Sequence, residues 1–464
     1  MKHLCIFLLF SMYLLSTAQQ QWTMGEKYLK MDGQPVFMNG VNYIPSDNWL
    51  MILDNWNPDV IKEDLTTLKA NGVDFIRFCP LWNLTQPETN KFNEEVFERI
   101  DYVFNVAEET GIKVQIAPIT GWMSGGVFLP SWANGELFTD PEIIEGQVNL
   151  VTKVAKRYKD SPALQGYDFG NEINVLLDRM KLNGTPGDVK EWMNTVYKAY
   201  QKADPDHFVT NGSGTGFNRF FNIWSISETS DYMSVHTYPY FHGTWNMDPW
   251  LGMRTSYSPN FVTAWAEMMG KPVLVQEIGA SESWMDRLKI PKYLQVTYYS
   301  TWADGAAGYW WWCSHNIDRD YTVKSEGLYT EYSISTFEKG NFSDLEYELG
   351  LLDINNKVKP VGNAFKKCTE TVNKLGLKWE DVLPTLYIII PEKADYYETM
   401  LNFITPYVIA KQTHMDVKLW PEWKGLPANA DAAVVPGFAL SEKGKTHLRK
   451  FLDNGGKVLQ SYHH

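Results

Sequence analysis

Short apolar runs alternate with amphipathic segments between Trp22 and Leu375, and this alternation restricts the fold of the 464-residue chain more than any other feature. The runs predict strands at residues 36–42, 74–78, 113–118, 164–170, 208–211, 232–236, 273–276 and 307–312. They are nearly continuous in apolar residues, which is typical of strands covered on both faces. Eight strands with helical or connecting sequence between them, over roughly 350 residues, predict a (β/α)8 TIM barrel.

The segments between the strands carry helix start and stop signals, such as Asn57-Pro58 and Asp140-Pro141 before a helix and Gly111 after one. Residues 359–375 form the predicted closing helix of the barrel. A hairpin with Asp32-Gly33 as its turn precedes the first barrel strand. We therefore expect residues 22–375 to form one barrel domain.

A second pattern follows the linker at residues 376–383. Strand-like and helical runs alternate again over residues 383–464, which predicts a smaller doubly wound α/β domain. This domain has only four predicted strands. Either it is a minimal domain, or the sequence is a fragment that ends within it; the second interpretation is the one we favour.

The first residues have the features of a secretory signal peptide. Lys2 precedes an apolar run at residues 4–15, and the small residues Ser16 and Ala18 follow it. The run is too short for a good membrane anchor. We therefore expect residues 1–18 to be a Sec-type signal peptide, and the protein to be secreted or periplasmic.

Composition and motifs argue against several kinds of partner and cofactor. The net charge of −13 is unfavourable for binding nucleic acid or an anionic membrane. Metal-ligand spacings, glycine-rich phosphate loops and dinucleotide-binding motifs are missing, so neither a metal nor a cofactor is predicted. The motif of a serine nucleophile is also missing. Cys79, Cys313 and Cys368 of the mature chain suit free buried thiols better than a disulfide framework.

Polar, charged and aromatic residues stand where each predicted strand ends. In a (β/α)8 barrel these ends meet at one mouth, where the loops build the active site. Asn171-Glu172 follows the fourth strand, and Glu277 follows the seventh. The other candidates are Arg77, Trp122, His236, Tyr238, Trp310 and Trp312. We expect these side chains to converge on one cavity.

Two carboxylates that face each other across a barrel mouth predict cleavage of a glycosidic bond. We expect Glu172 to be the acid, protonated near neutral pH, and Glu277 to be the ionised nucleophile, stabilised by Arg77 and the Tyr238 hydroxyl. A carboxyl separation of about 5 Å would make the reaction retaining. A solvated loop carboxylate is the alternative for a single Glu, but two with polar partners argue against it. A structural salt bridge for Arg77 and a bridge between strands for His236 are open alternatives.

The remaining candidates are assigned to substrate binding. Asn171 is expected to bond the sugar 2-hydroxyl. Trp312 is the preferred platform for a sugar ring, and Trp310 is the second choice. Because side chains alternate between the two faces of a strand, at least one ring of this run should be core. Trp122 is a weaker candidate for the wall of the cleft.

The segments "FMNGVNY", "GVDFIRF", "GYDFGNEIN", "VHTYPY", "VLVQEIGA" and "GYWWWC" together resemble the barrels of glycoside hydrolase clan A. They are most similar to family 5 and its mannanase-like members, over about residues 25–370. The resemblance implies a retaining β-glycoside hydrolase with Glu172 as acid/base and Glu277 as nucleophile. The implied partner is a polysaccharide or oligosaccharide, with β-mannosidic links as the first choice.

The C-terminal segments "ADAAVVPGF" and "FLDNGGKVL" resemble the flavodoxin-like trimerisation domain of family 42 β-galactosidases. This resemblance implies a homo-oligomer formed through the C-terminal domain. It also keeps open an exo-acting β-galactosidase or β-glucosidase with the same catalytic pair. "APITGW" lacks a His, and Ile278 stands where an aromatic residue is commoner, which leaves the substrate open. A non-catalytic carbohydrate-binding protein is the other alternative, but it should lack one of the two Glu.

Overall fold

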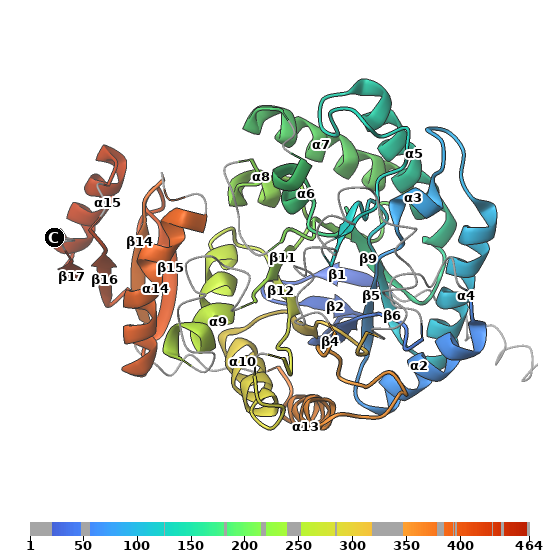
Figure 1. Ribbon diagram of the computed structural model, residues 1–464. Coiled ribbons are helices and arrows are strands. Elements are labelled where there is room, and N and C mark those ends of the chain that lie inside the picture. The colour runs from blue at the N-terminus through green and yellow to red at the C-terminus, as the bar shows by residue number, and fades with distance from the viewer. Residues whose placement is uncertain are drawn as a thin grey trace, which may run out of the picture.

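The computed structural model describes residues 21–47, 56–124, 126–180, 183–214, 220–238, 252–283, 285–317, 347–377, 385–392, 394, 397–428, 430–437 and 440–461. The proposed signal peptide lies outside these residues. A large barrel unit occupies most of the chain, and a smaller unit stands at its side (Figure 1). None of the described helices has the length and apolar character needed to cross a membrane.

Eight parallel strands form the barrel, as the sequence predicts. They are β4 (Met38–Asn42), β5 (Phe75–Phe78), β6 (Lys113–Ile116), β9 (Leu164–Asp168), β10 (Phe208–Thr210), β11 (Met233–His236), β12 (Val273–Ile278) and β13 (Gly308–Trp311). Their order is β10-β9-β6-β5-β4-β13-β12-β11, so each strand lies beside its neighbours in the chain and β4 pairs with β13. The ends β10 and β11 are bridged by a hydrogen bond from Thr210 Oγ1 to Ser234 Oγ of 2.9 Å, so the sheet is nearly a closed barrel.

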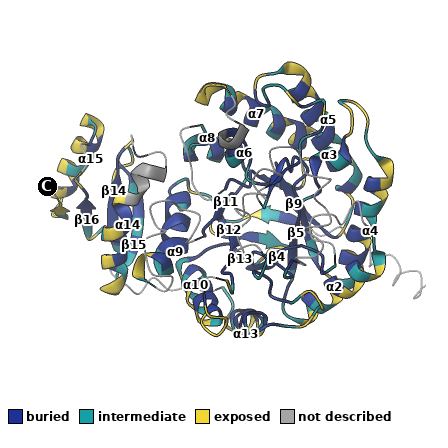
Figure 2. Cartoon of the chain, viewed as in Figure 1, coloured by how far each residue is buried: buried dark blue, intermediate teal, exposed yellow. Residues whose placement is uncertain are grey.

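Helices form an outer ring around these strands (Figure 1). They are α2 (Pro58–Ala70), α3 (Trp82–Thr85), α4 (Glu94–Thr110), α5 (Pro141–Tyr158), α6 (Ile173–Met180), α7 (Pro186–Ala203), α8 (Ile223–Glu228), α9 (Met253–Glu267), α10 (Ile290–Asp304) and α13 (Pro360–Leu375). Local signals set several of their ends: Thr185 and Asp188 form a capping box at the start of α7, and Gly111 ends α4 at φ 71°. Buried residues lie on the strands and on the inward faces of the helices (Figure 2).

A small antiparallel sheet precedes the barrel. It consists of β1 (Trp22–Met24), β2 (Leu29–Met31) and β3 (Gln34–Pro35). The turn at Asp32 and Gly33, with φ of 50° and 77°, confirms the predicted hairpin. Trp22 packs against Phe75, the first residue of β5, with ring centroids 6.3 Å apart. This sheet therefore covers the amino-terminal end of the barrel, opposite the mouth.

The smaller unit is a doubly wound α/β domain, as predicted. Its elements are β14 (Thr385–Ile390), α14 (Tyr397–Gln412), β15 (Asp416–Pro421), β16 (Ala432–Val435), α15 (Glu442–Asp453) and β17 (Lys457–Gln460). The four strands are parallel, in the order β15-β14-β16-β17. Ile388 packs in one cluster with Phe403 of α14, whereas Ile389 packs in another with Phe451 of α15. Because neighbouring residues of a strand point to opposite faces, the two helices cover opposite faces of the sheet.

The smaller unit packs on the outer ring of the barrel, where α14 lies beside α9 (Figure 1). Phe261 contacts Tyr407 with ring centroids 5.4 Å apart, and Trp265 contacts Phe403 at 5.9 Å. Lys411 Nζ lies 2.5 Å from Asp304 Oδ1 at the end of α10. Apolar and charged contacts therefore both hold the two units together.

Candidate active site

The barrel brings the predicted polar residues to one mouth. Arg77 lies in β5, and Asn171 and Glu172 follow β9. His236 ends β11, and it pairs with Glu277 near the end of β12. All of them, together with Tyr238, are linked by the contacts described below. The predicted convergence is therefore observed for these six side chains.

Glu277 is held by two donors. Its Oε1 contacts Arg77 Nη1, and its Oε2 accepts a hydrogen bond of 2.8 Å from the Tyr238 hydroxyl. The Glu277 side chain is only 4% exposed. These are the two residues that the sequence predicted as partners of this carboxylate, and they fix both of its oxygens in place.

Glu172 faces Glu277 from the opposite side of the mouth. Its Oε1 lies 2.8 Å from His236 Nδ1, which is also 3.4 Å from Glu277 Oε2. The two carboxylates approach within 4.8 Å of each other. The Glu172 side chain is 15% exposed, so it is the more accessible of the two. An oxygen separation of at most 4.8 Å is compatible with the value of about 5 Å for two carboxyls that act through a covalent intermediate.

The backbone at Glu172 is in the left-handed region, with φ of 44°. A non-glycine residue in this region is uncommon, and such residues concentrate at functional sites. Its N–H donates to Gly212 O at 3.0 Å, and its carbonyl accepts from Val175 N at the start of α6. The turn from strand to helix therefore aims this side chain at the mouth.

Arg77 is fully buried and organises the base of the site. Its Nε donates to Asp168 Oδ2 at 2.8 Å, and its Nη1 donates to Asn171 Oδ1 at 2.8 Å as well as contacting Glu277. Asn171 Nδ2 in turn donates to Trp122 O at 3.0 Å. Arg77 thus forms a structural salt bridge and also positions two predicted site residues.

The acidities of these groups follow from burial and from the nearby charges. Burial raises the pKa of Glu277, and the Glu172 charge adds to this effect, while His236, Arg77 and the Tyr238 hydrogen bond oppose it. Burial would lower the pKa of His236, but Glu277 and Glu172 outweigh it, so its pKa is raised. Burial also opposes the charge of Arg77, yet its carboxylate partners raise its pKa. The guanidinium therefore remains charged beside the proposed nucleophile.

The aromatic candidates separate into two groups. Trp312 lies directly after β13 and packs with Tyr238 in a cluster beside the mouth. Trp122 is in the short strand β7 (Trp122–Met123), which pairs with β8 (Gly126–Val127), and its carbonyl holds Asn171. Both rings are almost fully buried, so the role of Trp312 as a sugar platform and that of Trp122 in the cleft wall stay predictions.

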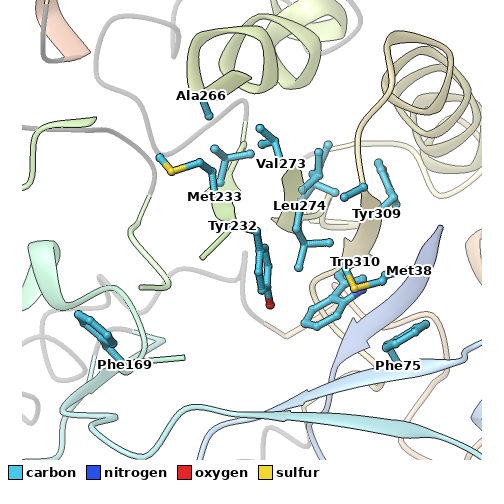
Figure 3. Close-up of a cluster of buried hydrophobic side chains, with 14 of the residues drawn as sticks. Met38, Phe75, Phe169, Tyr232, Met233, Ala266, Val273, Leu274, Tyr309 and Trp310 are labelled. Atoms are coloured by element: carbon cyan, nitrogen blue, oxygen red, sulfur yellow. The ribbon is translucent and has the colours of Figure 1, made fainter. Parts of the chain in front are cut away.

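Trp310 is a core residue, and the prediction that it could be a sugar platform is wrong. Its ring is fully buried inside the barrel and stacks on Phe75, with centroids 6.3 Å apart (Figure 3). It also fills the space beside Gly40, where an added Cβ would lie 2.5 Å from the ring. The alternation of side chains along β13 explains this, because Trp310 points inward and away from the mouth.

Sequence reasoning missed the residues below the mouth. Asp168 pairs with Arg77, and Gln276 lies 3.0 Å from His236 Nε2. Gln276 Nε2 also donates to Gln115 Oε1 at 2.6 Å. The available signal was a polar residue at a buried position of β6, β9 and β12, since a buried polar side chain requires a hydrogen-bond partner.

A metal ion is not favoured at this site. One ligand atom each of Glu172, His236 and Glu277 lies within 4.8 Å of the others, which is the only such group among the described residues. However, Arg77 already places a positive charge against Glu277. A cation there would be repelled by the guanidinium.

Comparison with protein families decides the assignment. A family model described as "Cellulase (glycosyl hydrolase family 5)" matches residues 29–318, which include the whole mouth of the barrel. The chain belongs to glycosyl hydrolase family 5. The family 5 barrel expected from the sequence is therefore confirmed.

The chain is also similar to individual curated proteins. It is 23% identical over 320 residues to a putative mannan endo-1,4-beta-mannosidase 5 of Oryza sativa subsp. japonica, covering 56% of this chain and 60% of that protein. The chain spans about three fifths of the length of the curated relatives it matches.

Solved structures share the fold over nearly the whole chain. The exo-beta-1,4-mannosidase Op5Man5 from Opitutaceae bacterium strain TAV5 has a TM-score of 0.79 at 23% identity, covering 94% of this chain and 79% of that one. A GH5_18 variant from Bifidobacterium longum subsp. longum, in complex with Manβ1-4GlcNAc, has a TM-score of 0.75 at 20% identity, covering 92% and 96%.

Proposed function

We propose that this family 5 member is a retaining β-glycoside hydrolase that cleaves β-mannosidic bonds. The observation that carries the proposal is the pair Glu172 and Glu277, whose carboxylates face each other within 4.8 Å. Glu277 is tied to a guanidinium and a tyrosine hydroxyl, whereas the Glu172 side chain is partly exposed to solvent. Such a pair is suited to a double displacement.

In the first step Glu277 attacks the anomeric carbon, and the bond to the leaving oxygen breaks. Glu172 gives its proton to that oxygen, so the leaving sugar departs as a neutral alcohol. Arg77 and Tyr238 orient the Glu277 carboxylate for the attack. In the second step Glu172, now ionised, removes a proton from water, which displaces Glu277 and releases the sugar with retained configuration.

Removal of each carboxylate tests these roles. Glu172→Ala and Glu277→Ala should each lower kcat by about 10³-fold or more. With a 2,4-dinitrophenyl β-mannoside, added azide should restore turnover in both variants. The Glu172→Ala product should be the β-azide, because azide attacks the glycosyl-enzyme, and the Glu277→Ala product should be the α-azide, because azide replaces the nucleophile.

Glu228→Ala is the control, since it removes a carboxylate at the end of α8, which is ion-paired with Lys190 at the surface. This variant should keep full activity. Azide products with the anomers exchanged would reverse the two assignments, and an unaffected kcat in either variant would contradict the mechanism.

The substrate is proposed from the relatives. The names of the mannan endo-1,4-beta-mannosidase of Oryza sativa and of the exo-beta-1,4-mannosidase Op5Man5 both point to β-1,4-mannosidic links. Assays of the full chain on aryl β-mannosides, aryl β-galactosides, aryl β-glucosides, mannan and mannotetraose would separate the alternatives. A preference for the aryl β-galactoside would overturn the proposed sugar. Release of mannose alone from mannotetraose would indicate exo action, and internal cleavage would indicate endo action.

We also propose that the enzyme is exported and associates through its C-terminal domain. The signal-like residues 1–18 support export, and a secreted protein whose amino-terminal sequence begins at Gln19 is expected. A molecular mass of more than one chain in light scattering would support association, whereas a single-chain mass would exclude it.

A further inference from the structure

A chain of buried polar side chains runs beneath the two catalytic carboxylates. Gln276 Oε1 lies 3.0 Å from His236 Nε2. The same amide group contacts Gln115 and Asp168 with its nitrogen, at 2.6 Å and 3.0 Å. All of these side chains are 1% exposed or less. The catalytic machinery proposed above does not use Gln276, although it precedes Glu277 in the sequence.

The orientation of the Gln276 amide is fixed by Asp168. Asp168 Oδ2 accepts from Arg77 Nε, and Asp168 Oδ1 accepts from Gly170 N at 3.2 Å. Burial raises the pKa of Asp168, while the charge and the hydrogen bonds of Arg77 favour its ionised form, which can only accept hydrogen bonds. The Gln276 atom beside it must therefore be the NH2 group. The carbonyl oxygen of Gln276 consequently faces His236.

This orientation determines which nitrogen of His236 titrates. An amide oxygen only accepts, so His236 Nε2 must carry a proton in order to bond it. His236 Nδ1 is then the only ring nitrogen that can gain or lose a proton. It lies 2.8 Å from Glu172 Oε1 and 3.4 Å from Glu277 Oε2.

We infer that Gln276 is a positioning residue that locks the tautomer of His236, so that His236 Nδ1 and Glu172 hold the proton of the general acid as one pair. When the pair has lost its last proton, the lone pair of Nδ1 faces the Glu172 carboxylate without a hydrogen between them. This arrangement is unfavourable, so loss of the proton from Nδ1 of His236 is disfavoured; burial opposes the charge of this ring, but Glu277 and Glu172 raise its pKa. The inference rests on the proposed function, because it assigns this proton to the leaving group.

Other charged groups around the pair act in the same or the opposite direction. Glu277 of β12 faces Nδ1 and favours retention of the proton, whereas Arg77 of β5 disfavours it. Asp168 of β9 acts on His236 through Gln276, and the Tyr238 hydroxyl stabilises the charge of Glu277 by donating a hydrogen bond to it. During bond cleavage one proton passes from the pair to the leaving oxygen, and the carboxylate of Glu172 remains as the base for the second step.

The variant Gln276→Met tests the lock, since it keeps the side-chain length and removes the acceptor. A neutral His236 could then place its proton on Nδ1 and donate it to the Glu172 carboxylate, which stabilises the ionised acid. The alkaline limb of kcat/KM for p-nitrophenyl β-mannoside should move to lower pH by about one unit. The loss should be larger for aryl β-mannosides with poor leaving groups, and small for the 2,4-dinitrophenyl compound, which needs no acid.

Nitrogen-15 NMR of histidine-labelled full-length protein provides a readout that does not depend on activity. His236→Asn identifies the His236 signals. In the unmodified protein Nε2 should stay protonated across the titration, and only Nδ1 should change. In Gln276→Met, the neutral ring should carry its proton on Nδ1. The matched control is Gln147→Met on α5, because the buried Gln147 bonds Leu137 O and Trp192 Nε1 outside the site.

Three results would overturn the inference, and the first two concern the tautomer of His236. One is deprotonation of Nε2 in the unmodified protein, and the other is a Gln276→Met variant with the same tautomer and the same alkaline limb. Equal losses for good and poor leaving groups would also contradict it, because a general packing defect would act on both. If the protein cleaved none of the tested glycosides, the proposed function would fail, while the NMR titration would still decide the tautomer.

Discussion

Glu277 illustrates how single residues at the mouth are tuned by opposing influences. Burial raises the pKa of its carboxyl group, and the nearby Glu172 adds to this, whereas His236, Arg77 and the Tyr238 hydroxyl lower it. A nucleophile must be ionised, so activity should be lost as the pH falls through the pKa of this group. The acid limb of kcat/KM should therefore lie above the ordinary glutamic acid pKa of about 4.3.

Tyr238→Phe should move this acid limb to higher pH. The change removes a hydrogen bond to the ionised form of Glu277, so the pKa of the carboxyl rises further, by about one unit. The measurement is the pH dependence of kcat/KM from about pH 4 to 9. Tyr197→Phe is the control, since its hydroxyl bonds Asp231 away from the mouth. An unchanged or lowered acid limb in Tyr238→Phe would show that the hydroxyl does not stabilise the carboxylate.

At this scale the sequence was informative only where strands end. Glu172 and Glu277 stand out because a carboxylate follows a buried run, and the contacts of Arg77 and Tyr238 with Glu277 were predicted correctly. Asp168 and Gln276 were missed because they lie inside such runs. The role of a polar residue inside a strand can be recognised only when its hydrogen-bond partner on another strand is known. That partner is distant in the sequence.

Among the elements, the turn after β10 shows how closely backbone approaches the site. Gly212 has φ of 54°, and a Cβ on it would lie 2.4 Å from both Asp168 carboxylate oxygens and 2.7 Å from Arg77 Nη2. Only glycine fits this position, because any side chain would clash with the buried ion pair of Asp168 and Arg77. The glycine therefore keeps β9 and β10 close together beneath the mouth.

Gly212→Ala should inactivate the enzyme, with a fall in kcat/KM of about 10²-fold or more, because it displaces Arg77 from Glu277. Gly270→Ala is the matched control: its φ of 74° is equally left-handed, but nothing lies within 4 Å of the added Cβ. The control should lose only about 1 kcal/mol of unfolding free energy in urea, and no activity. Equal effects of the two changes would mean that backbone strain, and not the clash, is decisive.

The elements themselves were largely predictable. Each of the eight barrel strands was located by its apolar run, with ends within a few residues, because burial on both faces leaves a continuous pattern. The assignment of Trp310 failed for a different reason. The run Trp310 to Trp312 does not reveal which face of β13 points inward, since the register is set by pairing with β4 and β12.

For the whole molecule, the contact between the two units was beyond sequence reasoning. The pattern of residues 383–464 predicted a doubly wound domain, but not the surface on which it rests. The contact joins α14 to α9 and α10 through Tyr407, Phe403 and the pair Lys411 and Asp304. Such docking depends on shape and on charges from distant segments, which leave no local signal.

Lys411→Met should lower the free energy of unfolding by about 1–3 kcal/mol, because it leaves the mostly buried Asp304 carboxylate without its cation. The side chains of this pair are only 14% and 21% exposed. Lys445→Met breaks an exposed pair on α15 and should change stability by about 0.5 kcal/mol or less. Urea denaturation of both variants decides the matter: a Lys411→Met protein as stable as the control would show that the contact is not a stabilising one.

Helix α9 is buried on two sides, against β11 and β12 within the barrel and against α14 outside it. Phe261 and Trp265 face the smaller unit from this helix. A protein truncated in the linker at residues 376–383 would expose these two rings to solvent as an apolar patch. The barrel domain prepared alone is therefore expected to self-associate, and polar substitutions of these two rings would be needed to prevent this.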